Sequence, residues 1–101
     1  MTIKIQPSDG KGTPPGKLAD AELHFNDGPL EGLKLIGFSI WERKTGSGRN
    51  VTFPARSYAV NGERRSYAML RPMVDSTAQT RLRDQILEAY AELTGTVEAT
   101  A

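Results

Sequence analysis

Hydrophobic and polar residues alternate along several short segments in the first two thirds of the chain, and this period of two predicts β-strands. The alternation is clearest at residues 18–25 and recurs over a shorter stretch at residues 2–6. Residues 33–41 are apolar on both predicted faces, as in a strand at the centre of a sheet or in an interface. The two faces are expected to carry Leu33, Leu35 and Trp41 on one side and Ile36, Phe38 and Ile40 on the other. Gly37 interrupts this segment and predicts a bulge or a close backbone approach.

Proline and glycine mark the connections between the strands. Residues 7–17 are rich in both and predict a long, flexible loop, and residues 44–49 predict a hairpin loop. Asn61 and Gly62 carry the strongest turn signal, because both accept the positive φ values of a two-residue type I′ turn. The two strands that this turn joins are predicted at residues 51–59 and 64–71.

After residue 75 the apolar residues recur at spacings of three and four, which predicts an amphipathic helix. Its apolar stripe consists of Ala78, Leu82, Ile86, Ala89, Tyr90 and Leu93. Ser76 followed by Gln79 predicts a capping box at the start of the helix, and Gly95 predicts its end. Residues 95–101 are expected to form a frayed tail.

Together these elements predict a single α+β domain over residues 1–101. Five antiparallel strands form a meander, and the C-terminal helix packs on one face of the sheet. A length of 101 residues suits one hydrophobic core. No apolar run approaches the roughly 20 residues that cross a bilayer, and the first residues show no signal-peptide pattern. We therefore expect a cytoplasmic protein that does not contact a membrane.

Residues suited to catalysis or metal binding are scarce. The chain has no cysteine, which excludes disulfides, thiolate metal sites and cysteine nucleophiles. Its one histidine, His24, falls on the polar face of a predicted strand, and no second imidazole exists to complete a metal site with it. The glycines at 46 and 48 are not followed by a helix and are interpreted as part of a hairpin loop. We expect no enzyme, no cofactor, no metal and no small-molecule substrate.

Charge is unevenly distributed along the chain, although the formal net charge is only +1. Residues 43–83 contain nine Lys or Arg residues and two acidic residues, a net charge of +7. Eight of the nine are arginines, and aromatic residues lie among them. Arginines interleaved with aromatic residues are typical of surfaces that bind nucleic acids.

The predicted Asn61-Gly62 turn sets the register of its two strands. The expected pairs are Val60 with Glu63, Tyr58 with Arg65, Arg56 with Tyr67, Pro54 with Met69 and Thr52 with Arg71. We name one face of this hairpin the Arg/Tyr face; it carries Arg56, Tyr58, Arg65 and Tyr67, flanked by Arg71. The other face is expected to cover the core and carries Val51, Phe53, Ala55, Ala68 and Leu70.

The Arg/Tyr face has three interpretations. In the first, the tyrosines stack on bases and the arginines contact phosphates, and each stacked base contributes about 1–3 kcal/mol. In the second, diagonal Arg–Tyr pairs only stabilise a solvated sheet face, through cation–π contacts of about 0.5–1 kcal/mol each. In the third, the face binds a second subunit.

The predicted start of the helix is a second candidate site. Ser76 and Thr77 lie where free backbone N–H groups bind anions. Arg81 and Arg83 lie in the first turns, which is the unfavourable end of the helix dipole for a cation and indicates a phosphate partner. The alternative is that Arg81 pairs with Asp84 or Gln85 and stays solvated.

Several short segments of the chain occur in a defined order. They are Phe53-Pro54-Ala55-Arg56, Asn61-Gly62-Glu63-Arg64, Arg71-Pro72, and a Ser-capped helix that contains Ile86-Leu87-Glu88-Ala89-Tyr90. With this order, over roughly residues 17–93, the chain resembles the SpoVG (stage V sporulation protein G) family of small bacterial regulators. It departs from the family at Gln79, where the family usually has an arginine, in its longer loop at residues 7–17, and in lacking a long acidic tail.

The resemblance implies a homodimer built on a strongly bent antiparallel sheet, and a bacterial cytoplasmic protein that binds DNA and RNA. Carried over by position, it places nucleic-acid contacts at Ser76, Thr77, Arg81 and Arg83. The expected function is that of a homodimeric, non-enzymatic regulator that binds DNA, RNA or both. The alternative is a protein–protein interaction module that does not bind nucleic acids.

Overall fold

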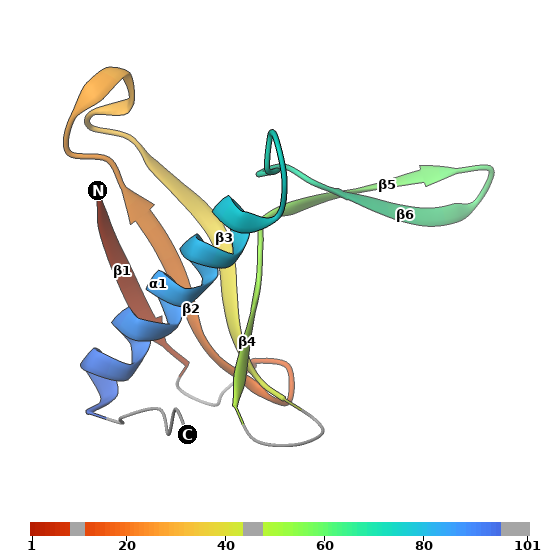
Figure 1. The fold of residues 1–101 in the computed structure, drawn as a ribbon. Coiled ribbons are helices and arrows are strands. Elements are labelled where there is room, and N and C mark those ends of the chain that lie inside the picture. The colour runs from red at the N-terminus through yellow and green to blue at the C-terminus, as the bar shows by residue number, and fades with distance from the viewer. Residues whose placement is uncertain (9–11, 44–47, 96–101) are drawn as a thin grey trace.

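The computed structural model describes residues 1–8, 12–43 and 48–95. This part of the chain forms a four-stranded antiparallel sheet in the order β1-β2-β3-β4, a separate two-stranded ribbon of β5 and β6, and one long helix (Figure 1). The elements are β1 (Thr2–Pro7), β2 (Lys17–His24), the 3-10 helix η1 (Gly28–Leu30), β3 (Lys34–Glu42), β4 (Arg49–Thr52), β5 (Ala55–Val60), β6 (Glu63–Ala68) and α1 (Thr77–Thr94). The predicted hairpin loop at 44–49 and the predicted tail at 95–101 lie largely outside the described residues.

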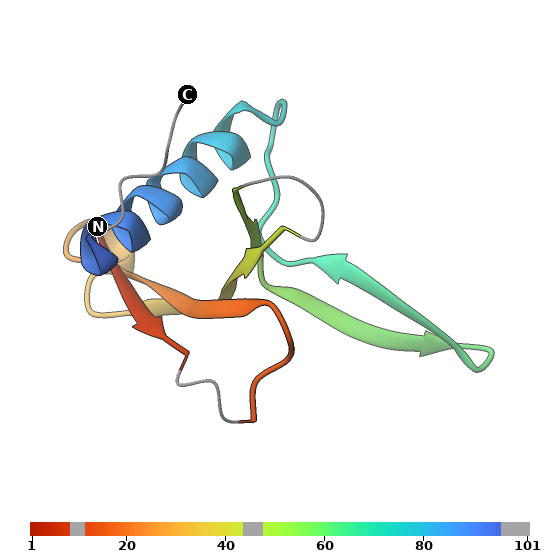
Figure 2. The ribbon, with the colours of Figure 1, turned by 90° about the horizontal axis from the view of Figure 1, so that it is seen from below.

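The α+β class and the antiparallel pairing are confirmed, but the prediction of one five-stranded sheet is wrong. In the described part of the chain β4 pairs with β3, whereas β5 pairs with β6 in a sheet of its own. The strand predicted at 51–59 divides at Phe53 and Pro54, because proline has no N–H to donate to a ladder. Figure 1 and Figure 2 show the β5–β6 ribbon pointing away from the rest of the molecule.

A bulge in β3 lies against the point where the ribbon leaves the sheet. The register of β3 on β2 shifts by one residue between Leu35 and Phe38, so β3 carries one extra residue there. Gly37 lies within this bulge with φ +107°, and a Cβ at this position would lie 3.0 Å from the Cβ of Pro54. Both predictions for Gly37, a bulge and a close approach, are confirmed.

The same bulge changes which side chains of β3 face the core. Leu35 packs against the core cluster to which Phe38 belongs, while Ile36 is exposed. The prediction that Ile36 shares a face with Phe38 while Leu35 lies on the opposite face is therefore wrong, because the extra residue reverses the alternation on one side of the bulge.

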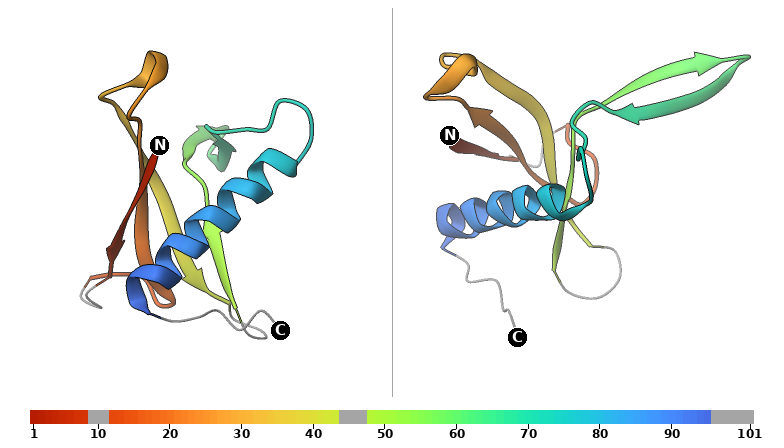
Figure 3. Two further views of the ribbon diagram at one scale, coloured as in Figure 1. Left: turned by 60° about the vertical axis from the view of Figure 1, so that its left-hand side comes forward. Right: turned by 45° about the horizontal axis from the view of Figure 1, so that its top comes forward.

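Helix α1 covers one face of the four-stranded sheet (Figure 3). The buried cluster between them consists of Ala19, Ala21, Leu23, Phe38, Ile40, Val51, Ile86, Leu87 and Tyr90. Of the predicted helical stripe, Ile86 and Tyr90 are buried, whereas Leu93 is exposed. Leu87, which the predicted stripe omits, is buried beside Ile86, so the apolar face of the helix is rotated slightly from the prediction.

The helix begins with a different cap from the one predicted. Ser76 already has helical φ and ψ of −74° and −1°, and its side chain makes no capping hydrogen bond, so the capping box with Gln79 is wrong. Instead the backbone N–H of Thr77 donates to Oδ1 of Asp75 at 2.9 Å. Hydrogen bonds from the side chain and backbone of Thr77 hold the pKa of Asp75 below its ordinary value. Gly95 has φ 71° in the left-handed region, which confirms the predicted end.

Candidate nucleic-acid interface

The β5–β6 ribbon is exposed along its whole length, since every residue of both strands is exposed. Its register is the predicted one, with Arg56 opposite Tyr67, Tyr58 opposite Arg65 and Val60 opposite Glu63. The turn is also as predicted: Asn61 and Gly62 have φ values of 50° and 78°. The Arg/Tyr face predicted from the turn is therefore assembled in the structure.

The two tyrosines of this face lie close together. The ring centroids of Tyr58 and Tyr67 are 5.7 Å apart with an interplanar angle of 56°, and the side chains are 41% and 39% exposed. The guanidinium carbon of Arg71 lies 5.6 Å from the centroid of the Tyr67 ring. Such a cation–π contact and a tilted ring pair hold the aromatic surfaces in place while leaving part of each ring open to solvent.

The arginines of the ribbon differ in how they are held. Nη2 of Arg65 lies 3.3 Å from Oε2 of Glu63, an exposed ion pair that contributes little to stability. Nε of Arg71 donates to the carbonyl oxygen of Ala68 at 2.7 Å, which fixes this side chain at the base of the ribbon. Arg56 makes no hydrogen bond or ion pair with any described residue, so its charge is available to a partner.

The opposite face of the ribbon does not cover the core as predicted. Ala55 and Ala68 are exposed, whereas Val51 is buried and Phe53 and Leu70 are half-buried against the core cluster. The prediction is wrong for the two alanines because the chain leaves the body after Pro54. Pairing extends one step inward, since the N–H of Met69 donates to the carbonyl of Pro54 at 2.9 Å.

Thr52 and Arg71 do not pair as predicted. Thr52 belongs to β4 and lies opposite Ser39 of β3. Arg71 follows the end of β6, in the connection to the helix, and remains beside the Arg/Tyr face through its contact with the Tyr67 ring and its hydrogen bond to Ala68. The ladder that would join Thr52 to Arg71 ends at Pro54, because there the two strands diverge into different parts of the fold.

The helix start presents fewer free groups than predicted. Ser76 and Thr77 are exposed, but the N–H of Thr77 is already bonded to the carboxylate of Asp75. Arg81 is exposed and makes no hydrogen bond or ion pair with the described residues. Arg83 is half-buried, and its Nη2 lies 3.6 Å from Oδ1 of Asp84. The predicted alternative of a local pairing therefore applies to Arg83 and not to Arg81.

Arg49, one of the arginines in the basic segment 43–83, packs against the helix instead of lying on the ribbon. The guanidinium carbon of Arg49 lies 4.9 Å from the centroid of the buried Tyr90 ring. This contact joins β4 to α1 and places a positive charge against the helix that covers the sheet. Arg49 thus contributes to the packing of β4 against α1. The charge pattern of the sequence does not distinguish such an arginine from those on the β5–β6 ribbon.

His24 takes part in a small polar cluster on the sheet. Its Nε2 lies 3.0 Å from Oε1 of Glu22, and Nζ of Lys34 lies 3.4 Å from the same oxygen. The hydrogen bonds with His24 and Lys34 lower the pKa of Glu22 from its ordinary value. Among the described residues no group of three or more His, Cys, Asp or Glu side chains is arranged to hold a metal ion.

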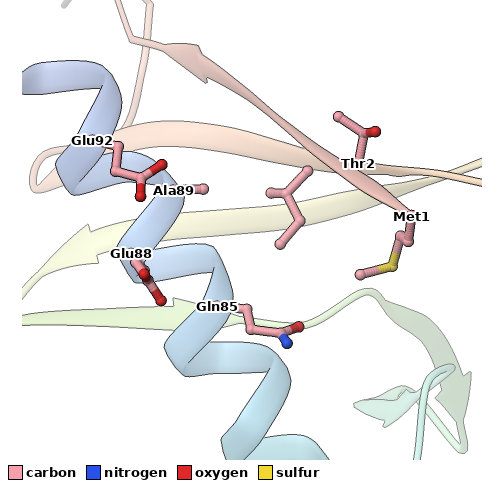
Figure 4. Close-up of a pocket in the computed structure, with 7 residues that line it drawn as sticks. Met1, Thr2, Gln85, Glu88, Ala89 and Glu92 are labelled. Atoms are coloured by element: carbon pink, nitrogen blue, oxygen red, sulfur yellow. The ribbon is translucent and has the colours of Figure 1, made fainter.

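An open hollow of about 430 Å³ lies between β1 and the C-terminal half of α1 (Figure 4). Met1, Thr2 and Ile3 line it from the strand, and Gln85, Glu88, Ala89 and Glu92 line it from the helix. The two carboxylates come from one exposed helix face, and no histidine, lysine or arginine side chain is among the described residues that line the hollow.

Comparison with known proteins adds no assignment to this geometry. In the described residues no helix is both long and apolar enough to cross a membrane. No protein-family model, no curated protein and no solved structure was found to match the chain.

Proposed function

We propose that the protein is a homodimeric, non-enzymatic regulator of the bacterial cytoplasm that binds DNA, RNA or both, as the resemblance to the SpoVG family implies. The observation that carries the proposal is the exposed ribbon, on which two open tyrosine rings lie between arginines. The arginines contact phosphates, and the tyrosines stack on bases. Arg81 at the helix start adds a further phosphate contact.

The shape of the ribbon supports this assignment. A two-stranded β-ribbon fits the major groove of duplex DNA, and an exposed aromatic pair suits the bases of a single strand. Arg56 has no competing partner among the described residues, so binding a phosphate breaks no internal ion pair. The ion pair of Arg65 with Glu63 is exposed and is exchanged for a phosphate at little cost.

The exposure of the ribbon also supports the homodimer. An isolated two-stranded hairpin is marginally stable in water, and both faces of this one are exposed. A partner that covers one face stabilises it. A second copy of the chain on one face stabilises the ribbon, and the Arg/Tyr face stays open to a nucleic acid.

The second candidate function is a protein–protein interaction module. Tyr and Arg are frequent hot-spot residues of protein interfaces, and the paired rings of Tyr58 and Tyr67 present such residues on an exposed ribbon. In this case the Arg/Tyr face binds another protein or a second copy, and nucleic acids do not compete for it.

The two functions are separated by a salt-dependent mobility-shift assay on single- and double-stranded DNA and RNA. Arg56→Ala with Arg65→Ala should weaken binding and reduce the slope of log affinity against log salt by about 0.9 for each lost duplex phosphate contact. Arg64→Ala is the matched control, because Arg64 lies on the same strand but pairs with Ala59 on the opposite face. Absence of any binding at low salt would exclude the proposed function.

A further inference from the structure

The connection between β6 and α1 carries two strongly exposed hydrophobic side chains. Met73 is 98% and Val74 is 94% exposed, more than any other large hydrophobic residue that the structure describes. Figure 1 and Figure 3 show this connection standing out from the body, above the first turn of α1 and beside the base of the ribbon. Two adjacent hydrophobic side chains held in water indicate a surface that contacts a partner.

The tip of this connection, residues 72–74, lies between two segments that are each held by a hydrogen bond. On the ribbon side, Arg71 donates to the carbonyl of Ala68 at 2.7 Å. On the helix side, the carboxylate of Asp75 accepts the N–H of Thr77 at 2.9 Å. Leu70, just before the tip, packs against the core cluster. The residues on both sides of Met73 and Val74 are therefore held by contacts, which limits the entropy lost when these side chains bind.

Basic residues flank Met73 and Val74 in the sequence. Arg71 precedes them, and the unpaired Arg81 lies in the second turn of the helix that follows. Their charge complements a polyanion. Asp75 follows Val74, but its carboxylate accepts the N–H of Thr77, and the two arginines leave this segment with a net positive charge. The charge pattern thus favours a nucleic acid over a second copy at this surface.

We propose that Met73 and Val74 form a wedge that inserts between adjacent base pairs of duplex DNA while Arg71 and Arg81 contact the flanking phosphates. This inference rests on the proposed function and names its ligand as a deformable duplex. Proteins that bend DNA commonly insert apolar side chains, Met among them, between base steps from the minor groove. Pyrimidine–purine steps such as TpA unstack most easily, so the wedge prefers them.

The test uses a short DNA duplex with 2-aminopurine in place of the adenine of a single TpA step. Binding of the wild-type protein should raise the 2-aminopurine fluorescence, because unstacking relieves its quenching. Met73→Ser with Val74→Ser should abolish this rise and weaken binding by roughly tenfold, with the salt slope unchanged. Both side chains are exposed, so the variant should keep the wild-type fold. Leu33→Ser, another exposed hydrophobic on the connection before β3, is the matched control and should behave as wild type.

The possible failures are distinguishable. Salt-dependent binding without a fluorescence rise, or a double variant that matches wild type, overturns the wedge and leaves the proposed function standing. Absence of nucleic-acid binding by the wild type removes both. Sedimentation that shows the double variant dissociating from a dimer, with its fluorescence response intact, overturns the wedge and assigns the tip to a subunit contact.

Discussion

Replacing Gly37 by alanine should destabilise the protein strongly, because two separate costs fall on this position. The first is conformational: Gly37 has φ +107°, where an L-residue is strained by about 1–3 kcal/mol. The second is steric, since the new Cβ would lie 3.0 Å from the Cβ and 3.5 Å from the Cα of Pro54. Neither of these atoms is the end of a flexible side chain, so the backbone must shift.

The two costs together are about 2–6 kcal/mol, taking overpacking at about 1–3 kcal/mol. For a domain of this length, each 1 kcal/mol lowers Tm by roughly 4–8 °C. We therefore expect Gly37→Ala to lower Tm by at least about 8 °C in a thermal unfolding experiment followed by circular dichroism.

Gly32→Ala is the control for the conformational cost alone. Gly32 has φ +86°, and nothing lies within 4 Å of the position of its Cβ. The difference in Tm between the two variants measures the contact with Pro54. A Pro54→Gly background, which removes the nearest atom, should reduce the cost of Gly37→Ala. Equal losses for Gly37→Ala and Gly32→Ala would refute the conclusion that the bulge is held against Pro54.

Three further predictions test the body, the helix cap and the ribbon. Ile86 is fully buried, so Ile86→Ala should cost about 2–5 kcal/mol in urea unfolding, and a loss as small as that of exposed Leu93→Ala would contradict the assigned core. Asp75 has a folded-state pKa below its ordinary value of 3.8, so its stabilisation is present above about pH 4 and disappears as pH falls through the folded pKa. Asp75→Ala should lower Tm at pH 7 and flatten the acid limb of the Tm–pH curve; a curve parallel to wild type would count against the cap. Tyr67→Ala should weaken single-stranded DNA binding by about 1–3 kcal/mol at an unchanged salt slope, whereas loss of a dimer with unaltered DNA affinity would support the interaction-module alternative.

The register of the strands that form the Arg/Tyr face could be predicted from the residues of the turn alone. The Asn61-Gly62 turn was sufficient to predict which residues of β5 and β6 lie opposite one another, and the structure confirms that register. A two-residue turn sets register through the backbone of its immediate neighbours, so no distant contact is needed. Gly95 likewise marked the end of the helix, because a left-handed residue is a local requirement.

The helix cap shows a local prediction that failed. Ser76 and Asp75 are both good capping residues, and the sequence pattern favours Ser76 because Gln79 follows it at the right spacing. In the structure Ser76 is already helical, and the carboxylate of Asp75 accepts the N–H of Thr77. Which of the two side chains reaches a free N–H depends on the path of the chain between β6 and α1, and not on residue type.

The sequence by itself determined most of the strands, the turn, the helix and the composition of the Arg/Tyr face, because alternation and turn chemistry act over a few residues. Only the tertiary structure decided that β4 and β5 belong to different sheets, which exposes Ala55 and Ala68 and leaves the ribbon free on both faces. The two parts of the fold meet where Gly37 of β3 approaches Pro54, and these residues lie so far apart in sequence that neither segment's pattern names the other as its partner. The presentation of Met73 likewise depends on tertiary structure, since a hydrophobic residue is exposed only where the surrounding fold leaves it without neighbours.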